Sequence, residues 1–172
     1  NKAYINFTSD SVMKEVVNYY DSHGTANEQL QAHYELGSVY RDLNDAPKAL
    51  QCYYDAVDKA DTTSSDCDYS LLGTVHSQIA VLFLLQESPN LALSEMDKAI
   101  RYAWMAHDPY LAINTYEQKS CVYYNLNMLD SAINISVAAS SMYKKFNYPK
   151  QSATALSCAI SALLKRGEYS RV

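Results

Sequence analysis

The sequence has little of what marks several large classes of protein. Its longest apolar run, residues 79–85, is far shorter than the roughly 20 residues that a membrane-spanning helix needs. Only four glycines and four prolines occur in 172 residues, too few for a disordered or low-complexity chain. The 14 Lys and Arg residues are outnumbered by 19 Asp and Glu residues, so a nucleic-acid-binding or anionic-membrane surface is not expected. These absences leave an ordinary folded domain with a real core.

Cysteine is scarce and shows no metal-binding spacing. The four cysteines, Cys52, Cys67, Cys121 and Cys158, include no Cys-x-x-Cys pair and have no histidines at zinc-finger spacing. Their even number would allow two disulfides in an oxidising compartment. Cys52, Cys121 and Cys158 fall inside helical patterns, where a small apolar residue packs against a neighbouring helix, so we expect free thiols.

Motifs for catalysis and metal binding are also missing. There is no His-Glu-x-x-His, no glycine-rich phosphate loop and no Gly-x-Ser-x-Gly turn. Cys67 and His76 could be read as a nucleophile and its base, but a loop thiol near a histidine on a helix surface is the simpler interpretation. Asp61, Asp66 and Asp68 lack the glycine and glutamate of a calcium loop, so we expect helix caps and solvated charge. We predict no catalytic residue, no metal and no cofactor, and therefore no enzyme.

What the sequence does contain is helical periodicity with regular punctuation. Pro47, Pro89, Pro109 and Pro149 each stand just before an amphipathic run, in the place where a helix tolerates proline. Ser88 and Asp108 precede two of them and are good N-cap residue types. No stretch alternates as a strand would. The pattern predicts eight helices and one polar loop of about eight residues (61–68), the helices covering residues 9–22, 27–43, 47–60, 69–87, 89–107, 109–126, 129–146 and 149–166.

Two successive helices share a spacing that recurs along the chain. Residues 36–56 read Leu36-Gly37-x-x-Tyr40 and then Ala49-x-x-x-Tyr53-x-x-Ala56. A glycine lets two helices approach closely, alanines keep the second helix thin, and tyrosines fill the space between them. A fourth unit begins with Ile160 and Leu163 and reaches Gly167-Glu168-Tyr169. The intervening second and third units keep the phase with Ala80, Phe83, Ala92, Met96 and Ala99, and with Ser120, Tyr123, Ala132, Ser136 and Ala139.

This spacing resembles the signature of the tetratricopeptide repeat (TPR), in a long, tyrosine-rich form similar to that of bacterial multi-repeat sensors and regulators. The resemblance implies an all-α, right-handed superhelical solenoid of about eight antiparallel helices, one domain over residues 1–172. The chain begins with Asn1 and stops early in a repeat, so we expect a fragment of a longer protein. The implied units are 9–24 (the second helix of a truncated unit), 30–68, 73–108, 113–148 and 153–172 (the start of a fourth).

In a TPR solenoid the first helix of each pair lines the concave face. Carried over position by position, the resemblance implies a mostly neutral, hydrogen-bonding groove with Tyr34 and Tyr124 as aromatic anchors, suited to an extended peptide or a helix. Tyr34 and Ser38 stand where TPR modules that clamp a chaperone C-terminus have Lys and Asn, so that binding mode is not expected. The predicted groove residues are Tyr34, Glu35, Ser38, Arg41, Gln78, Glu117, Gln118, Tyr124 and Asn125.

The leading functional hypothesis is a non-enzymatic scaffold that binds a protein or peptide partner in this groove. The alternative is a regulatory or sensor input domain of a larger bacterial signalling protein, and a third possibility is a structural spacer that self-associates. We expect no nucleic acid and no membrane contact for this segment. The compartment stays open between the cytoplasm and an extracytoplasmic, lipoprotein-anchored position, and so does the oligomeric state.

Overall fold

The computed structural model describes residues 9–167, and every regular element in this part of the chain is an α-helix. Consecutive helices pack as pairs, with α2 on α3, α4 on α5 and α6 on α7. The predicted all-α class is confirmed. The helices are α1 (Ser11–His23), α2 (Ala26–Asp42), α3 (Ala46–Lys59), α4 (Tyr69–Leu85), α5 (Pro89–Met105), α6 (Pro109–Asn125), α7 (Leu129–Lys145), α8 (Pro149–Thr154) and α9 (Ser157–Arg166).

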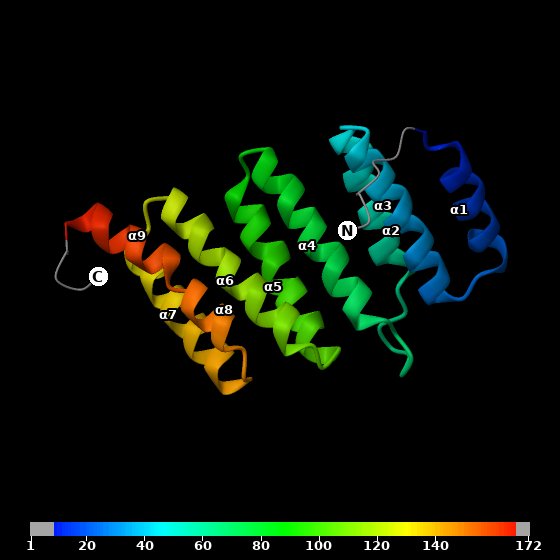
Figure 1. Cartoon of the computed structure of the whole chain (residues 1–172). Helices are drawn as coiled ribbons and strands as arrows, with labels where there is room; N and C mark the ends of the chain where they lie inside the picture. The colour runs from blue at the N-terminus through cyan, green and yellow to red at the C-terminus, as the bar shows by residue number, and fades with distance from the viewer. Residues whose placement is uncertain (1–8, 168–172) are drawn as a thin grey trace.

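The helices lie side by side in one extended row, with α1 at one end and α9 at the other (Figure 1). Contacts between pairs join helices that are close in sequence, such as α3 with α4 and α5 with α6. A row of this kind has a core that runs along the molecule as a strip, so each pair depends on its immediate neighbours for burial. Within residues 9–167, no helix combines the length and hydropathy required to cross a bilayer.

From α4 onward the chain advances in steps of 20 residues. Each of α4, α5, α6 and α7 has 17 residues, and three residues connect it to the next helix. The middle residue of every connection has a left-handed backbone, with φ of 54° at Glu87, 55° at His107, 60° at Asn127 and 63° at Asn147. Asparagine adopts this conformation more readily than other residues that carry a Cβ. Two such steps give the 40-residue period of the sequence.

The first unit is longer because of a single loop. α2 also has 17 residues, but α3 has 14 and is followed by residues 60–68 before α4 begins. The Asn27 side chain of α2 holds this loop, since its amide nitrogen donates to the Asp66 carbonyl at 2.7 Å and its oxygen accepts from the Asp68 N–H at 3.0 Å. The three extra residues between units one and two are therefore absorbed outside the helices, which keep the same register.

Proline and capping residues begin the helices much as predicted. Proline occupies the first turn of α3, α5, α6 and α8. Asp68 and Asp108 each accept a hydrogen bond at 2.9 Å from the backbone N–H three residues later. Thr25 and Glu28 form a reciprocal capping box at the start of α2. Ser88 does not cap α5 with its side chain, and instead its hydroxyl donates to the carbonyl of residue 86 at 3.3 Å.

The repeat residues lie at the contacts between helices. A methyl group at Gly37 would lie 2.5 Å from the Cδ1 and Cε1 atoms of the fully buried Tyr53 ring, so this glycine makes room for the tyrosine. Tyr123 is half-buried. The buried repeat residues are Leu36, Gly37, Tyr40, Ala49, Tyr53, Ala56, Ala80, Phe83, Ala92, Ala99, Ala132 and Ala139.

The last predicted helix, 149–166, is divided into α8 and α9, so the prediction of one continuous helix was wrong. Ala155 and Leu156 between them keep right-handed helical dihedrals, and the chain therefore only changes direction slightly. Ile160, expected at the contact within the pair, is 39% exposed because no later helix of the described residues covers it. Gly167 ends α9 with φ of 79°, and residues 168–169 of the predicted turn lie outside the described residues.

The four cysteines are free, as expected. Cys52 is buried between helices, in line with the prediction for a small apolar residue. The prediction was wrong for Cys121, which is exposed on α6, and Cys158 is half-buried on α9. The helical pattern places both residues in a helix but does not distinguish a buried side from an outward one.

Candidate protein-binding face

Residues predicted for the groove come from α2, α4 and α6 and recur at equivalent helix positions. Tyr34 and Glu117 each lie eight residues after the first residue of their helix, and Arg41 and Tyr124 each lie fifteen residues after it. Because the helix pairs repeat along the row, we expect equivalent positions of the first helices to lie on one side of it. We call this set the first-helix face, made of Tyr34, Glu35, Ser38, Arg41, Gln78, Glu117, Gln118, Tyr124 and Asn125.

Most members of the first-helix face are accessible. Gln118 and Asn125 are exposed. Ser38 is the exception, since it is buried and its hydroxyl lies 3.4 Å from the hydroxyl of Tyr53. This serine therefore supports Tyr53 from inside the pair and does not offer a surface for a ligand. The half-buried members are Tyr34, Glu35, Arg41, Gln78, Glu117 and Tyr124.

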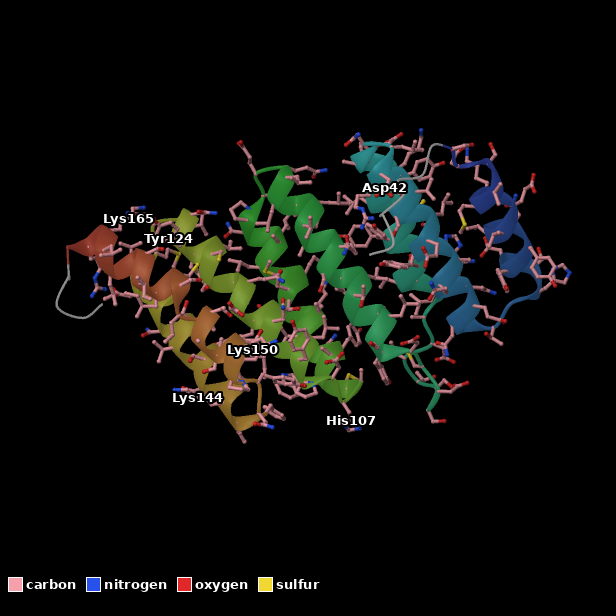
Figure 2. The ribbon with its side chains drawn as sticks, in the orientation of Figure 1. Asp42, His107, Tyr124, Lys144, Lys150 and Lys165 are labelled. Carbon is pink, nitrogen blue, oxygen red and sulfur yellow. The ribbon has the colours of Figure 1, made fainter. Side chains whose placement is uncertain are left out.

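Contacts across the face tie neighbouring helices together. Arg41 of α2 donates from Nη1 to Oε1 of Gln78 on α4 at 3.0 Å, and also donates to Asp42 at 2.9 Å. Lys165 of α9 places its Nζ 5.0 Å from the ring centre of Tyr124 on α6, and Figure 2 shows the two together near the end of the row. The side chains are thus held in place before any partner arrives.

Two tyrosines of the second helices, Tyr53 and Tyr143, lie next to members of the first-helix face. The ring of Tyr34 stacks on that of Tyr53 of α3, with 5.9 Å between ring centres. Burial, followed by the negative charge of Glu117, raises the pKa of Tyr143 on α7 well above its usual value. Tyr34 is therefore a rigid aromatic surface, and Tyr143 stays a neutral phenol behind Glu117.

Lys165 belongs to the same face and was missed by sequence reasoning. It lies sixteen residues after the start of α8, as Asn125 does after the start of α6. The 40-residue spacing between these two residues was the available signal.

His76, the suggested base, lies in a buried contact between two helices. His76 is buried in α4, with Nδ1 2.6 Å from Oε2 of Glu95 on α5 and its ring stacked on Tyr102 at 5.4 Å. Burial alone would raise the pKa of Glu95, but hydrogen bonds from His76 and Lys98 outweigh it and hold this pKa below its ordinary value. This buried hydrogen bond between His76 and Glu95 joins α4 to α5.

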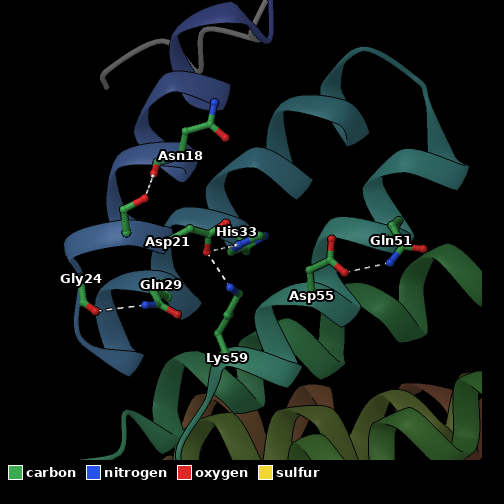
Figure 3. Close-up of polar contacts among 9 residues, drawn as sticks. Asn18, Asp21, Gly24, Gln29, His33, Gln51, Asp55 and Lys59 are labelled. Atoms are coloured by element: carbon green, nitrogen blue, oxygen red, sulfur yellow. Dashed lines mark hydrogen bonds and ion pairs between the residues drawn. The ribbon is translucent and has the colours of Figure 1, made fainter.

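A second polar cluster ties the first three helices together (Figure 3). Oδ1 of Asp21 on α1 lies 3.0 Å from Nε2 of His33 on α2 and 2.7 Å from Nζ of Lys59 on α3. Partial burial opposes the charge on Asp21, yet the bonds from Lys59 and His33 keep its pKa below the ordinary value. The cluster explains how α1 is fixed to the row through charge as well as packing.

The acidic residues of the loop 60–68 bond to nearby backbone and hydroxyl groups. Within residues 9–167, no three His, Cys, Asp or Glu side chains are arranged to hold a metal ion. Asp61 accepts instead from the N–H and hydroxyl of Thr63, at 3.0 and 2.6 Å. Asp68 caps α4, as predicted for these loop aspartates.

Comparison with solved structures decides the architecture. The structure is similar to aspartyl phosphate phosphatase F from Bacillus subtilis, with a TM-score of 0.76 and 16% identity over 94% of this chain. It is also similar to BtubC from P. vanneervenii, with a TM-score of 0.66, 12% identity and 92% of this chain covered. The fold is a TPR-like solenoid. At sequence identities this low, the comparison shows only that the folds are similar.

The TPR-like chain spans 42% of the phosphatase chain and 73% of BtubC. No protein-family model matches its sequence. A search of curated proteins also finds no match. In the TPR-like arrangement α2, α4 and α6 are the first helices of successive pairs, which is the basis for the register of the first-helix face.

Proposed function

We propose that this TPR-like chain is a non-catalytic protein-interaction module that binds a peptide or a short helix across the first-helix face. The observation that carries the proposal is the repeated placement of half-exposed, hydrogen-bonding side chains on successive first helices, in one register. Contacts such as Arg41 with Gln78 already order these side chains, which lowers the entropy lost on binding.

The side chains of the first-helix face favour a partner that is bound through amide hydrogen bonds and packing against aromatic rings. Gln78, Gln118 and Asn125 can each donate to and accept from a peptide backbone. Tyr34 and Tyr124 offer flat surfaces whose orientation is fixed by Tyr53 and Lys165. The face also carries the carboxylates of Glu35 and Glu117, and the chain has a net charge of −5, so we expect a neutral or basic partner.

The test begins with a peptide selected from a displayed random library on the folded chain. Its affinity is then measured for the double variant Tyr34→Ala with Tyr124→Ala. We expect a loss of at least about tenfold, which corresponds to about 1.4 kcal/mol, because aromatic anchors dominate such interfaces. Circular dichroism checks that the variant keeps its helix content.

The matched control is Tyr19→Ala. Tyr19 is 59% exposed on α1, a helix that contributes no residue to the first-helix face. Its replacement should leave the affinity unchanged. An equal loss with Tyr19→Ala, or no loss with the double variant, would place the binding surface elsewhere.

A second candidate is a regulatory input domain of a larger bacterial signalling protein. It is favoured by the likeness to a Bacillus subtilis phosphatase of which the chain covers less than half. In this case binding at the first-helix face would act on a further domain. The complete gene tests this: an output domain beside the repeats supports it, and a chain of repeats alone removes it.

A further inference from the structure

Two cysteines from different units meet on the accessible side of the molecule. Sγ of Cys121 on α6 lies 2.7 Å from Sγ of Cys158 on α9. The two sulfur atoms are therefore adjacent and within reach of a disulfide bond, whose length is about 2.03–2.05 Å. The other two cysteines differ, since Cys52 is buried in α3 and Cys67 lies in the loop 60–68.

The surroundings of this pair bring the same two helices together by other means. Lys165, two turns after Cys158 on α9, lies over the ring of Tyr124, which is almost one turn after Cys121 on α6. α9 otherwise packs mainly on α7. The sulfur contact therefore lies between α9 and α6, the first helix of unit three.

We propose that Cys121 and Cys158 form a dithiol pair that low-molecular-weight disulfides, such as glutathione disulfide, oxidise reversibly to an intramolecular disulfide. In the first step one thiol loses its proton and its sulfur attacks glutathione disulfide. A mixed protein–glutathione disulfide forms, and one glutathione leaves as a thiolate that takes up a proton. In the second step the other cysteine sulfur attacks the protein sulfur of the mixed disulfide and expels the second glutathione.

The electrons balance across the two steps. The two cysteines lose two hydrogens, as two protons and two electrons, and one glutathione disulfide becomes two glutathiones. Partial burial and the hydrogen bond with Cys158 raise the pKa of Cys121 to about 11, so its thiolate is scarce at neutral pH. Attack by Cys121 is therefore slow near neutrality, and the short distance between the sulfurs favours the second step over accumulation of the mixed disulfide.

The disulfide would close a loop between two residues that lie 37 positions apart. Such a covalent tie restricts opening of the segment that it encloses, here α7, α8 and the start of α9. We therefore expect oxidation to slow the opening of α8 and α9 and to leave α1 to α3 unchanged.

The experiment treats the folded chain with glutathione disulfide at mildly alkaline pH, followed by peptide mapping and hydrogen exchange by mass spectrometry. The expected product is a covalent Cys121–Cys158 peptide pair that has lost two hydrogens, with Cys52 and Cys67 free. Amide exchange in α8 and α9 should slow at least about tenfold and return to its original rate after dithiothreitol. Exchange in α2 should not change.

Four variants make the result specific. Cys121→Ser and Cys158→Ser should each abolish the oxidant-dependent change in exchange, whereas Cys67→Ser should leave it intact. Helix content by circular dichroism verifies folding of each variant, and Cys121→Ala provides a second version at the exposed position. A disulfide that uses Cys67 or a second chain, a product that stops at the mixed disulfide, or a disulfide that leaves exchange in α9 unchanged would each overturn the proposal.

Discussion

Buried hydroxyls on α7 illustrate how single residues set local stability. Ser136 is fully buried, and its hydroxyl has no hydrogen-bond partner in the structure. Ser140, one turn later and equally inaccessible, donates to the Ser152 carbonyl at 2.7 Å. A buried polar group without a partner costs free energy, whereas a paired one contributes about 0.5–1.5 kcal/mol.

We predict opposite effects for two alanine substitutions at these sites. Ser136→Ala should leave the free energy of unfolding unchanged or raise it, because it removes an unpaired hydroxyl. Ser140→Ala should lower it by about 1 kcal/mol, because the Ser152 carbonyl loses its donor. Urea denaturation followed by circular dichroism measures both. Destabilisation of similar size in the two variants would show that the Ser136 hydroxyl has a partner.

Gly37 and Tyr53 form a second residue-scale pair. Gly37→Ala should destabilise by about 1–3 kcal/mol, because the added methyl group collides with the buried Tyr53 ring. Unit two has Ala80 and Met96 at the equivalent positions. In a Tyr53→Met background, Gly37→Ala should therefore cost clearly less. A double-mutant cycle by urea denaturation measures this coupling; additive effects would contradict direct contact as the cause.

At the scale of elements, the connections between helices have one shared geometry and varied residues. Asn44, Asn127 and Asn147 suit the left-handed middle position, but Glu87 adopts it with φ of 54°. Asparagine tolerates this conformation better because its short amide side chain bonds locally. The same turn conformation is thus repeated along the chain. Where its middle residue is not asparagine, as at Glu87, the turn lowers the stability of the protein.

Glu87→Asn should raise the free energy of unfolding by about 0.5–1 kcal/mol. Glu87→Gln removes the same charge without the left-handed preference and is the matched control, for which we expect little change. Urea denaturation of the three proteins at one ionic strength gives the comparison. If both variants gain equally, the charge and not the backbone conformation explains the effect.

The buried Glu95 carboxylate, which is hydrogen-bonded to His76 of α4 and Lys98 of α5, makes stability depend on pH. The pKa of Glu95 is lowered in the folded state from the ordinary value of 4.5. Its charged form therefore contributes stability that is present above about pH 4.5 and is lost as the pH falls through the lowered pKa. Removal of this charge should matter at pH 5 and much less at pH 3.

Glu95→Gln should reduce the free energy of unfolding by about 1.5–3 kcal/mol at pH 5, because His76 and Lys98 lose a charged acceptor. The difference from the unchanged protein should shrink toward pH 3. Asp130→Asn is the control, since Asp130 pairs with Arg166 while 87% exposed, and we expect less than about 0.5 kcal/mol. A gap that stays constant from pH 5 to pH 3 would argue against the ionised Glu95.

For the whole molecule, the sequence predicts the architecture well because each level of information agrees. Proline positions, capping residues and apolar spacing all mark the same helix boundaries, and the repeat fixes which helices pair. The break at Ala155 and Leu156 escaped prediction because both residues keep helical dihedrals and the apolar spacing continues through it. Nothing in a local pattern distinguishes such a change of direction from a straight helix.

The sequence predicted the helix positions of the candidate binding residues better than it predicted their exposure to solvent. Repeat spacing places Tyr34, Gln78 and Tyr124 on successive first helices, and the structure gives each a half-exposed side chain. Ser38 is buried because Tyr53 of the partner helix reaches across the space that Gly37 leaves. The proximity of Cys121 to Cys158 depends on how two units stack on each other. The spacing of residues within one helix carries no information about that stacking.

The central claim, that the first-helix face binds a peptide, is tested most directly by nuclear magnetic resonance with the isotope-labelled chain. A peptide selected on the folded chain is titrated in, and shifts of backbone amide signals are mapped onto the structure. The account predicts that the largest shifts fall in α2, α4 and α6, around Tyr34, Gln78 and Tyr124. Shifts confined to α3, α5 and α7 would contradict it and place the binding surface on the opposite side of the row.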